Sequence, residues 1–131
     1  MVDLTSAPVP FLGVPRTSLQ VSTNGFLTFD SAPADPSNYH SSSTPSTTDS
    51  SLVLAVFADD LFGNELLPGA QVYAKRVSAG VDPFAAAPHW IVQWHHYSFF
   101  TFIISSTSLA DDYNFQVKLF DDGVIEYHYQ Q

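Results

Sequence analysis

The sequence predicts an all-β fold, an antiparallel β-sandwich of about seven or eight strands. Three observations predict it: apolar and polar residues alternate over short segments, turn residues separate these segments at short intervals, and no segment has a convincing helical period. The chain has 131 residues, of which 45% are hydrophobic and 15% aromatic. It is therefore long and apolar enough to form one domain, residues 1–131, without disulfides.

The N-terminal part of the chain predicts an extended segment followed by a β-hairpin. The prolines within residues 1–15 indicate an extended lead-in or an edge segment. In residues 17–30, Asn24 and Gly25 mark a turn. A three-residue loop at this turn pairs apolar residues with each other: Val21 with Leu27 and Leu19 with Phe29. A two-residue loop would face them with polar residues, so we expect the longer loop, with its glycine in the left-handed region.

Residues 31–51 form a long segment that is rich in Ser, Thr and Pro and almost free of aliphatic residues. This composition favours a solvated loop between two strands. Tyr39 and His40 are its bulky side chains, and a tyrosine among serines is typical of a rigid anchor in a recognition loop. The loop is therefore a candidate contact surface. We expect that replacing residues 37–49 by a Gly–Ser linker leaves folding intact and weakens attachment.

The middle of the chain contains three segments with strand character. The apolar run at residues 52–58 predicts a central strand with both faces buried, and the segment AQVYAKRV predicts another strand. Residues 82–88 form either a loop or one short helical turn. In the strand expected at residues 89–97, strict alternation places the adjacent His95 and His96 on opposite faces. On such a strand the two histidines cannot bind one metal ion together.

The last predicted element is a β-hairpin in residues 115–129. A three-residue loop of Asp121, Asp122 and Gly123 pairs apolar residues across it: Leu119 with Ile125, Val117 with Tyr127 and Phe115 with Tyr129. The same register places Lys118 opposite Glu126 on the outer face. We expect this pair to be a structural cross-strand contact worth roughly 0.2–1 kcal/mol, because exposed ion pairs are weak.

Composition and charge exclude several classes of function. The net charge of −9, from 13 acidic and 4 basic residues, disfavours nucleic acid and anionic membranes, whose binding depends on clustered Lys and Arg. The sequence has no cysteine for disulfides or thiolate chemistry, and no apolar run of the roughly 20 residues that a membrane helix needs. The sequence motifs of hydrolases, metalloproteases and phosphate-binding loops are absent. We therefore expect a non-enzymatic protein without a cofactor.

Acidic pairs beside predicted turns are the candidate metal ligands. Calcium takes carboxylate and carbonyl oxygens from irregular loops. The best placed carboxylates are those of Asp59, Asp60, Asp111 and Asp112. Their spacing does not match a dedicated calcium loop, and aspartate is also common in turns. A structural calcium ion is thus a minor alternative, and we expect chelators to change the melting temperature only slightly.

Aromatic residues in and after the strand expected at residues 89–97 are candidate contact residues. Phe99, Phe100 and Phe102 follow one another too closely to face one core from a regular strand, and an exposed apolar patch usually marks an interface. If the domain bound sugars, the stacking platforms would be Trp90, Trp94 and Tyr97. A place in the core is the more frequent role of tryptophan.

Five segments in this order resemble the nidogen-like (NIDO) family of extracellular domains and related bacterial surface modules. They are STNGFLTF (22–29), LAVFADDL (54–61), AQVYAK (70–75), HWIVQWHHY (89–97) and YNFQVKLFDDGVIEYHY (113–129). The resemblance covers most of the chain and implies an extracellular adhesive or matrix module with no catalytic residues. The departures are the Ser/Thr loop and the stop after Tyr129, where such domains often continue with another strand.

Three hypotheses about function follow. The first is an adhesion or protein–protein interaction module of a larger secreted or cell-surface protein. The second is a self-assembling subunit of an extracellular filament or sheath, in which a strand or terminus completes a neighbour's sheet. The third is a carbohydrate-binding module. The expected partner is therefore a protein or a cell surface, with a second copy of the chain or a glycan as alternatives.

Overall fold

The computed structural model describes residues 1–29, 52–59, 61–63, 69–99 and 112–130, and every structural statement below concerns this part of the chain. It contains eleven strands: β1 (Val2–Asp3), β2 (Val9–Phe11), β3 (Val14–Arg16), β4 (Ser18–Val21), β5 (Phe26–Phe29), β6 (Val53–Ala55), β7 (Leu61–Gly63), β8 (Gln71–Val77), β9 (His89–Phe99), β10 (Tyr113–Phe120) and β11 (Ile125–Gln130). Within the described residues there is no helix.

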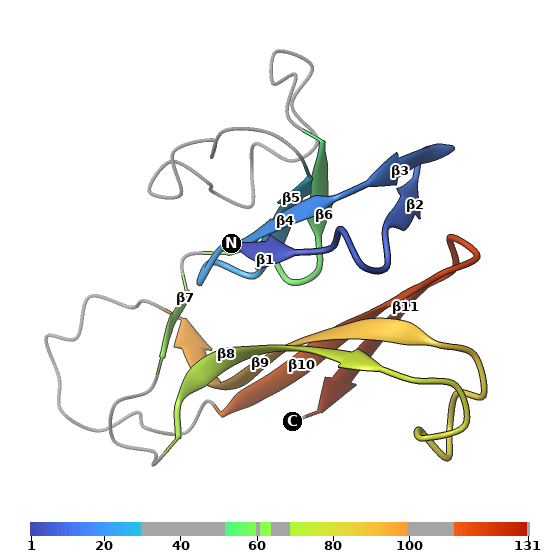
Figure 1. The fold of residues 1–131 in the computed structure, drawn as a ribbon. Helices are drawn as coiled ribbons and strands as arrows, with labels where there is room; N and C mark the ends of the chain where they lie inside the picture. Colours follow the sequence, from blue (N-terminus) through green and yellow to red (C-terminus); the bar gives the residue numbers. More distant parts are fainter. Residues whose placement is uncertain (30–51, 60, 64–68, 100–111, 131) are drawn as a thin grey trace, which may run out of the picture.

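The strands form two larger antiparallel sheets and one small hairpin. The four-stranded sheet has the order β1-β4-β5-β6, and the five-stranded sheet has the order β11-β10-β9-β7, with β8 also paired to β9. Strands β2 and β3 pair only with each other. Figure 1 shows the two larger sheets facing one another. The predicted all-β antiparallel fold is confirmed, and the number of strands is higher than expected because several of them are only two to four residues long.

The core lies between the two larger sheets. The four-stranded sheet contributes Leu19, Leu27, Phe29 and Leu54, and the five-stranded sheet contributes Val92, Trp94, Phe115, Val117 and Leu119. The Trp94 ring stacks on Phe115 with 4.9 Å between ring centroids. Its buried Nε1 donates a hydrogen bond of 2.8 Å to the carbonyl of Ser22, which directly follows β4. This bond satisfies the one polar atom of the indole and ties the sheets together.

Both predicted hairpins form with the predicted registers. In the first, Val21 lies opposite Leu27. In the second, Leu119 lies opposite Ile125. Gly25 and Gly123 have φ angles of 75° and 89°, in the left-handed region that favours glycine. Agreement between apolar alternation and turn chemistry therefore predicted both registers.

The prediction of a central strand at residues 52–58 is wrong. Only Val53–Ala55 is a strand, and β6 is the edge of the four-stranded sheet. After it the chain bends, and the N–H groups of Val56 and Phe57 both donate to the carbonyl of Gly25, at 3.1 and 2.9 Å. The Phe57 ring then packs beside Tyr113, Phe115 and Tyr129. The run is apolar because it turns toward the core, not because two sheet neighbours cover it.

Two other segments also differ in detail from the structure predicted for them. The helical turn considered for residues 82–88 does not form, because a β-bridge joins Asp82 to Ala85 and closes a tight turn instead. Within residues 1–15, β1 pairs with β4 and β2 pairs with β3, so the segment contributes one edge strand and a small hairpin. The Ser/Thr/Pro-rich segment at residues 31–51 lies outside the described residues.

Candidate functional site

A buried ion pair lies under the segment that connects β8 to β9. Lys118 lies opposite Glu126 in the backbone register, as predicted. Its side chain is not an exposed cross-strand partner, however, because it is only 4% exposed and its Nζ donates to Asp82 Oδ2 at 2.6 Å. The predicted backbone register is therefore right, but the predicted exposed contact between the Lys118 and Glu126 side chains is wrong. The connecting segment covers the outer face of the sheet at this end.

A histidine completes this buried cluster. His89 is fully buried, and its Nδ1 donates to the carbonyl of Ala87 at 2.8 Å. Its Nε2 lies 3.4 Å from Asp82 Oδ2. The hydrogen bond from Lys118, together with the one from the Phe84 N–H, lowers the pKa of Asp82 below its ordinary value of 3.8. Asp82 is thus held as a carboxylate at the base of the connecting segment.

The connecting segment, residues 78–88, presents apolar side chains to solvent. Val81 is 66% exposed and Phe84 is 90% exposed. Two further contacts close the segment on itself: Gly80 N–H donates to the Ala86 carbonyl at 3.1 Å, and the Asp82 carboxylate accepts the Phe84 N–H at 2.8 Å. The backbone that carries the protruding phenylalanine is therefore fixed by these contacts and by the ion pair beneath it.

Other exposed apolar residues lie at the same end of the sandwich. Leu12 and Val14 are exposed at the β2–β3 hairpin, and Val124 is exposed at the β10–β11 turn. Figure 1 shows these two turns and the segment before β9 at one end of the molecule. We call these three turns together the turn end; its exposed apolar residues are Leu12, Val14, Val81, Phe84 and Val124.

Polar contacts connect the parts of the turn end. Arg76 of β8 donates to Asp121 at 2.7 Å, and the Asp121 N–H donates to the Pro88 carbonyl at 3.4 Å. The sequence reasoning missed this surface. The signal that could have found it is a stretch, VDPFAAAP, that combines two prolines, a phenylalanine and a single charge within a predicted loop.

The tryptophans proposed as sugar platforms do not present free rings. Trp94 is fully buried and Tyr97 is buried, and burial raises the pKa of the Tyr97 hydroxyl. Trp90 is half-buried; its Nε1 donates to the Ala7 carbonyl at 3.0 Å, and the Arg76 guanidinium lies 5.9 Å from its ring centroid. These three residues have structural roles. The other aromatic candidates lie outside the described residues or have side chains outside them: Tyr39, His40, Phe99, Phe100 and Phe102.

A β-bulge in β9 overturns the prediction for the adjacent histidines. His96 has a φ angle of 59°, and the register with β10 shifts between Tyr113 and Phe115. The extra residue returns Tyr97 to the core, on the side of Trp94. The rings of His95 and His96 consequently lie 3.7 Å apart instead of on opposite faces. Strict alternation fails here because a bulge inserts one residue into one strand only.

The candidate metal ligands are only partly described. Asp60 and Asp111 lie outside the described residues. Asp112 accepts from Asn114 Nδ2 at 3.2 Å and lies 2.8 Å from His96 Nδ1. In the described ranges, no group of three or more His, Cys, Asp or Glu residues is placed to hold a metal ion. Asp59 lies in the segment after β6, and a calcium site at these aspartates stays a prediction.

These observations define an all-β sandwich domain with structural ion pairs inside its turns and an apolar turn end. A family model described as NIDO related matches residues 7–131, and the chain therefore belongs to the nidogen-related family. This finding confirms the resemblance in the sequence and suggests an extracellular β-domain of a generally non-enzymatic family. No curated protein and no solved structure matches the chain significantly. In the part of the chain described, no helix is suited to cross a membrane.

Proposed function

We propose that the chain is a non-enzymatic extracellular module that attaches to another protein through its turn end. The observation that supports this proposal is the exposure of Phe84 and Val81 on a segment that the Lys118–Asp82 pair holds in place. Exposed groups of large apolar residues on a soluble domain usually mark an interaction site. The family supports the extracellular part of the proposal.

The energetics favour a binding role for this segment. Burying an exposed apolar side chain of this size stabilises a complex by roughly 1.5–3 kcal/mol. The backbone bonds of residues 78–88 already fix the segment, so little conformational freedom is lost on binding. Phe84 therefore has the properties of an anchor residue, which is a preformed aromatic side chain that enters a pocket of the partner.

The charge of the chain indicates the chemistry of the partner. With a net charge of −9, this chain repels acidic surfaces. The partner is expected to offer an apolar recess for Phe84 with a neutral or basic rim. The strand-donation alternative loses its proposed N-terminal donor, because β1 and β2 already pair within this chain.

Attachment of protein-coated beads to cells or extracellular matrix tests the proposal. The test variant is Val81→Ser/Phe84→Ser, and the matched control is Tyr127→Ser, because Tyr127 is 41% exposed on β11 and outside the turn end. We expect the double variant to lose roughly 90% or more of attachment, as for the loss of a hot-spot anchor, while the control keeps it. Unchanged attachment of the double variant would contradict the proposal. A variant with residues 37–49 replaced by a Gly–Ser linker tests whether the Ser/Thr/Pro-rich loop contributes instead.

A further inference from the structure

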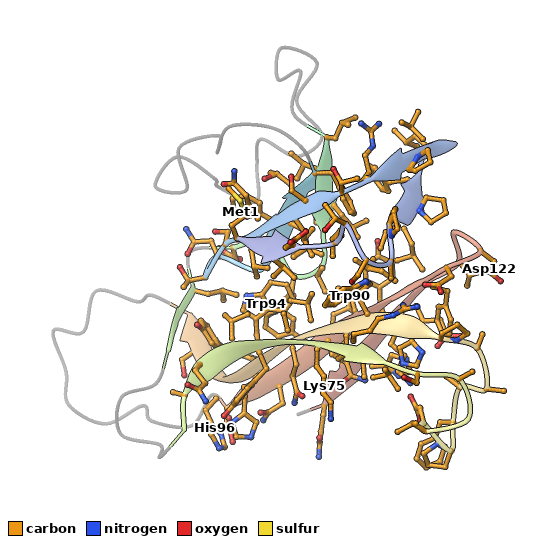
Figure 2. The ribbon with its side chains drawn as sticks, viewed as in Figure 1. Met1, Lys75, Trp90, Trp94, His96 and Asp122 are labelled. Carbon is orange, nitrogen blue, oxygen red and sulfur yellow. The ribbon has the colours of Figure 1, made fainter. Side chains whose placement is uncertain are left out.

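The outer face of the five-stranded sheet carries a shallow hollow of about 440 Å³. Its lining consists of Tyr73, Lys75, Ile91, Gln93, His95 and Gln116. Ile91, Gln93 and His95 alternate along β9 with the core residues Val92 and Trp94, so they face away from the sandwich. Figure 2 shows Lys75 pointing away from the four-stranded sheet. The hollow is separate from the turn end.

An aromatic ring and two amides form a row across this hollow. Tyr73 lies opposite Gln93, and Gln93 lies opposite Gln116, on three neighbouring strands. Because neighbouring strands lie about 4.8 Å apart, the ring and the amides form one continuous line. The Tyr73 side chain is 43% exposed, and its ring meets His95 edge-on at 6.2 Å. The row therefore offers an aromatic surface beside groups that can both donate and accept hydrogen bonds.

Of the polar side chains in the hollow, His95 contacts the carbonyl of Gly69 at 3.3 Å, and the other three with nitrogen-bearing groups are not used by the fold. Among the described residues, the side chains of Lys75, Gln93 and Gln116 have no hydrogen-bond or ion-pair partner. The neighbouring cation on β8 is paired by contrast, since Arg76 donates to Asp121 at 2.7 Å. The hydrogen-bonding capacity of the hollow is thus available to a ligand.

The charge distribution selects the kind of ligand. The chain has 13 acidic residues, yet the hollow is lined by none of them. Of the four basic residues, Arg76 and Lys118 are in ion pairs, and Arg16 also has a partner. Lys75 is the one lysine or arginine without a partner in the described part of the chain, and it lies at the hollow. This arrangement is complementary to a ligand that carries an anionic group.

We propose that this hollow binds a saccharide that carries a carboxylate, such as a short oligomer of a uronic acid. A sugar ring packs against Tyr73, its hydroxyl groups bond the amides of Gln93 and Gln116, and its carboxylate pairs with Lys75. An extended peptide that pairs with the sheet backbone would bind at the outer edge of β8 and not in the hollow, because β9 is already paired on both sides with β8 and β10.

Isothermal titration calorimetry of the full chain with trigalacturonic acid tests this proposal. We expect saturable binding that Lys75→Met and Tyr73→Ala each weaken roughly ten- to a hundredfold, the range for loss of one charge-assisted contact or one stacking contact. Tyr127→Ala, which removes a similarly exposed tyrosine from β11, is expected to bind as the wild type does. Melting temperatures check that all three variants are folded.

Four results would overturn the proposal. The first is no binding of trigalacturonic acid, and the second is binding that neither Lys75→Met nor Tyr73→Ala weakens. A neutral trisaccharide that binds as tightly would show that the carboxylate is not recognised. A triglutamate peptide that binds as tightly would show that the hollow is a site for acidic peptides.

Discussion

Lys118 and Asp82 lie 36 positions apart in the sequence and form an ion pair with 2.6 Å between Nζ and Oδ2. The pair joins the last part of β10 to the segment that presents Phe84. Because Lys118 is buried, removing either partner of the pair would leave an uncompensated charge and would destabilise the fold. We expect Lys118→Met to lower the melting temperature, and Lys75→Met, which removes an exposed lysine, to leave it unchanged.

The pH dependence of stability provides a sharper test of this pair. Because folding lowers the pKa of Asp82 below 3.8, its contribution is fully present above that value and is lost as the pH falls through the lowered pKa. The difference in unfolding free energy between wild type and Lys118→Met should therefore be largest above about pH 4 and shrink toward pH 2. Urea unfolding between pH 2 and 7 measures it. A difference that stays constant over this range would contradict the assignment.

The two hairpin glycines are expected to differ in their tolerance of a side chain. A Cβ on Gly123 would lie 3.5 Å from Pro10 Cβ, which is an ordinary contact. Gly123→Ala should therefore lower the free energy of unfolding only by the cost of placing alanine at a left-handed φ angle, roughly 1–2 kcal/mol. A Cβ on Gly25 would collide with the backbone carbonyl of Phe57. Gly25→Ala should therefore destabilise the domain considerably more. Chemical denaturation ranks the two variants. Equal losses of unfolding free energy would show that Gly25 does not lie close to the Phe57 carbonyl.

The bulge at His96 predicts opposite responses at two adjacent positions. A β-branched residue suits an extended strand but not a positive φ angle. His95→Val should therefore be neutral or stabilising, whereas His96→Val should destabilise by about 1–2 kcal/mol, because His96 has a φ angle of 59°. Unfolding free energies of both variants check this. The same response at both positions would indicate a regular strand without a bulge.

Removal of metal ions is expected to leave the melting temperature nearly unchanged. The carboxylate of Asp112 already contacts His96 and Asn114. Thermal unfolding with and without EDTA is the measurement. A drop of many degrees that calcium restores would instead identify Asp59, Asp60, Asp111 and Asp112 as ligands.

The sequence was most informative where local rules agree with each other. Apolar alternation and a glycine at the loop position together determine the register of both hairpins, because a shift by one residue would expose the apolar face. The contact between Lys118 and Asp82 could not be predicted in this way. It depends on how residues 78–88 fold back over the sheet, and this long-range contact has no local pattern.

The bulge in β9 was not predictable for a related reason. Alternation continues correctly from Trp90 to Trp94 and then fails, because Tyr97 returns to the core. The Asn114 side chain on β10 accepts the His96 N–H at 3.1 Å, so the partner strand supplies part of the support for the bulge. The hollow around Tyr73 also arises from side chains on three strands, and single-strand patterns do not reveal which of them are neighbours.

Photo-crosslinking from position 84 tests directly whether the turn end is the contact surface. The photoreactive residue p-benzoylphenylalanine is placed at position 84 in one variant and at position 127 in a control, and each protein is illuminated while attached to cells or matrix. We predict light-dependent adducts with a protein of that surface from position 84 and none from position 127, because only the former lies in the turn end. Adducts from position 127 alone would contradict the assignment of the turn end as the contact surface.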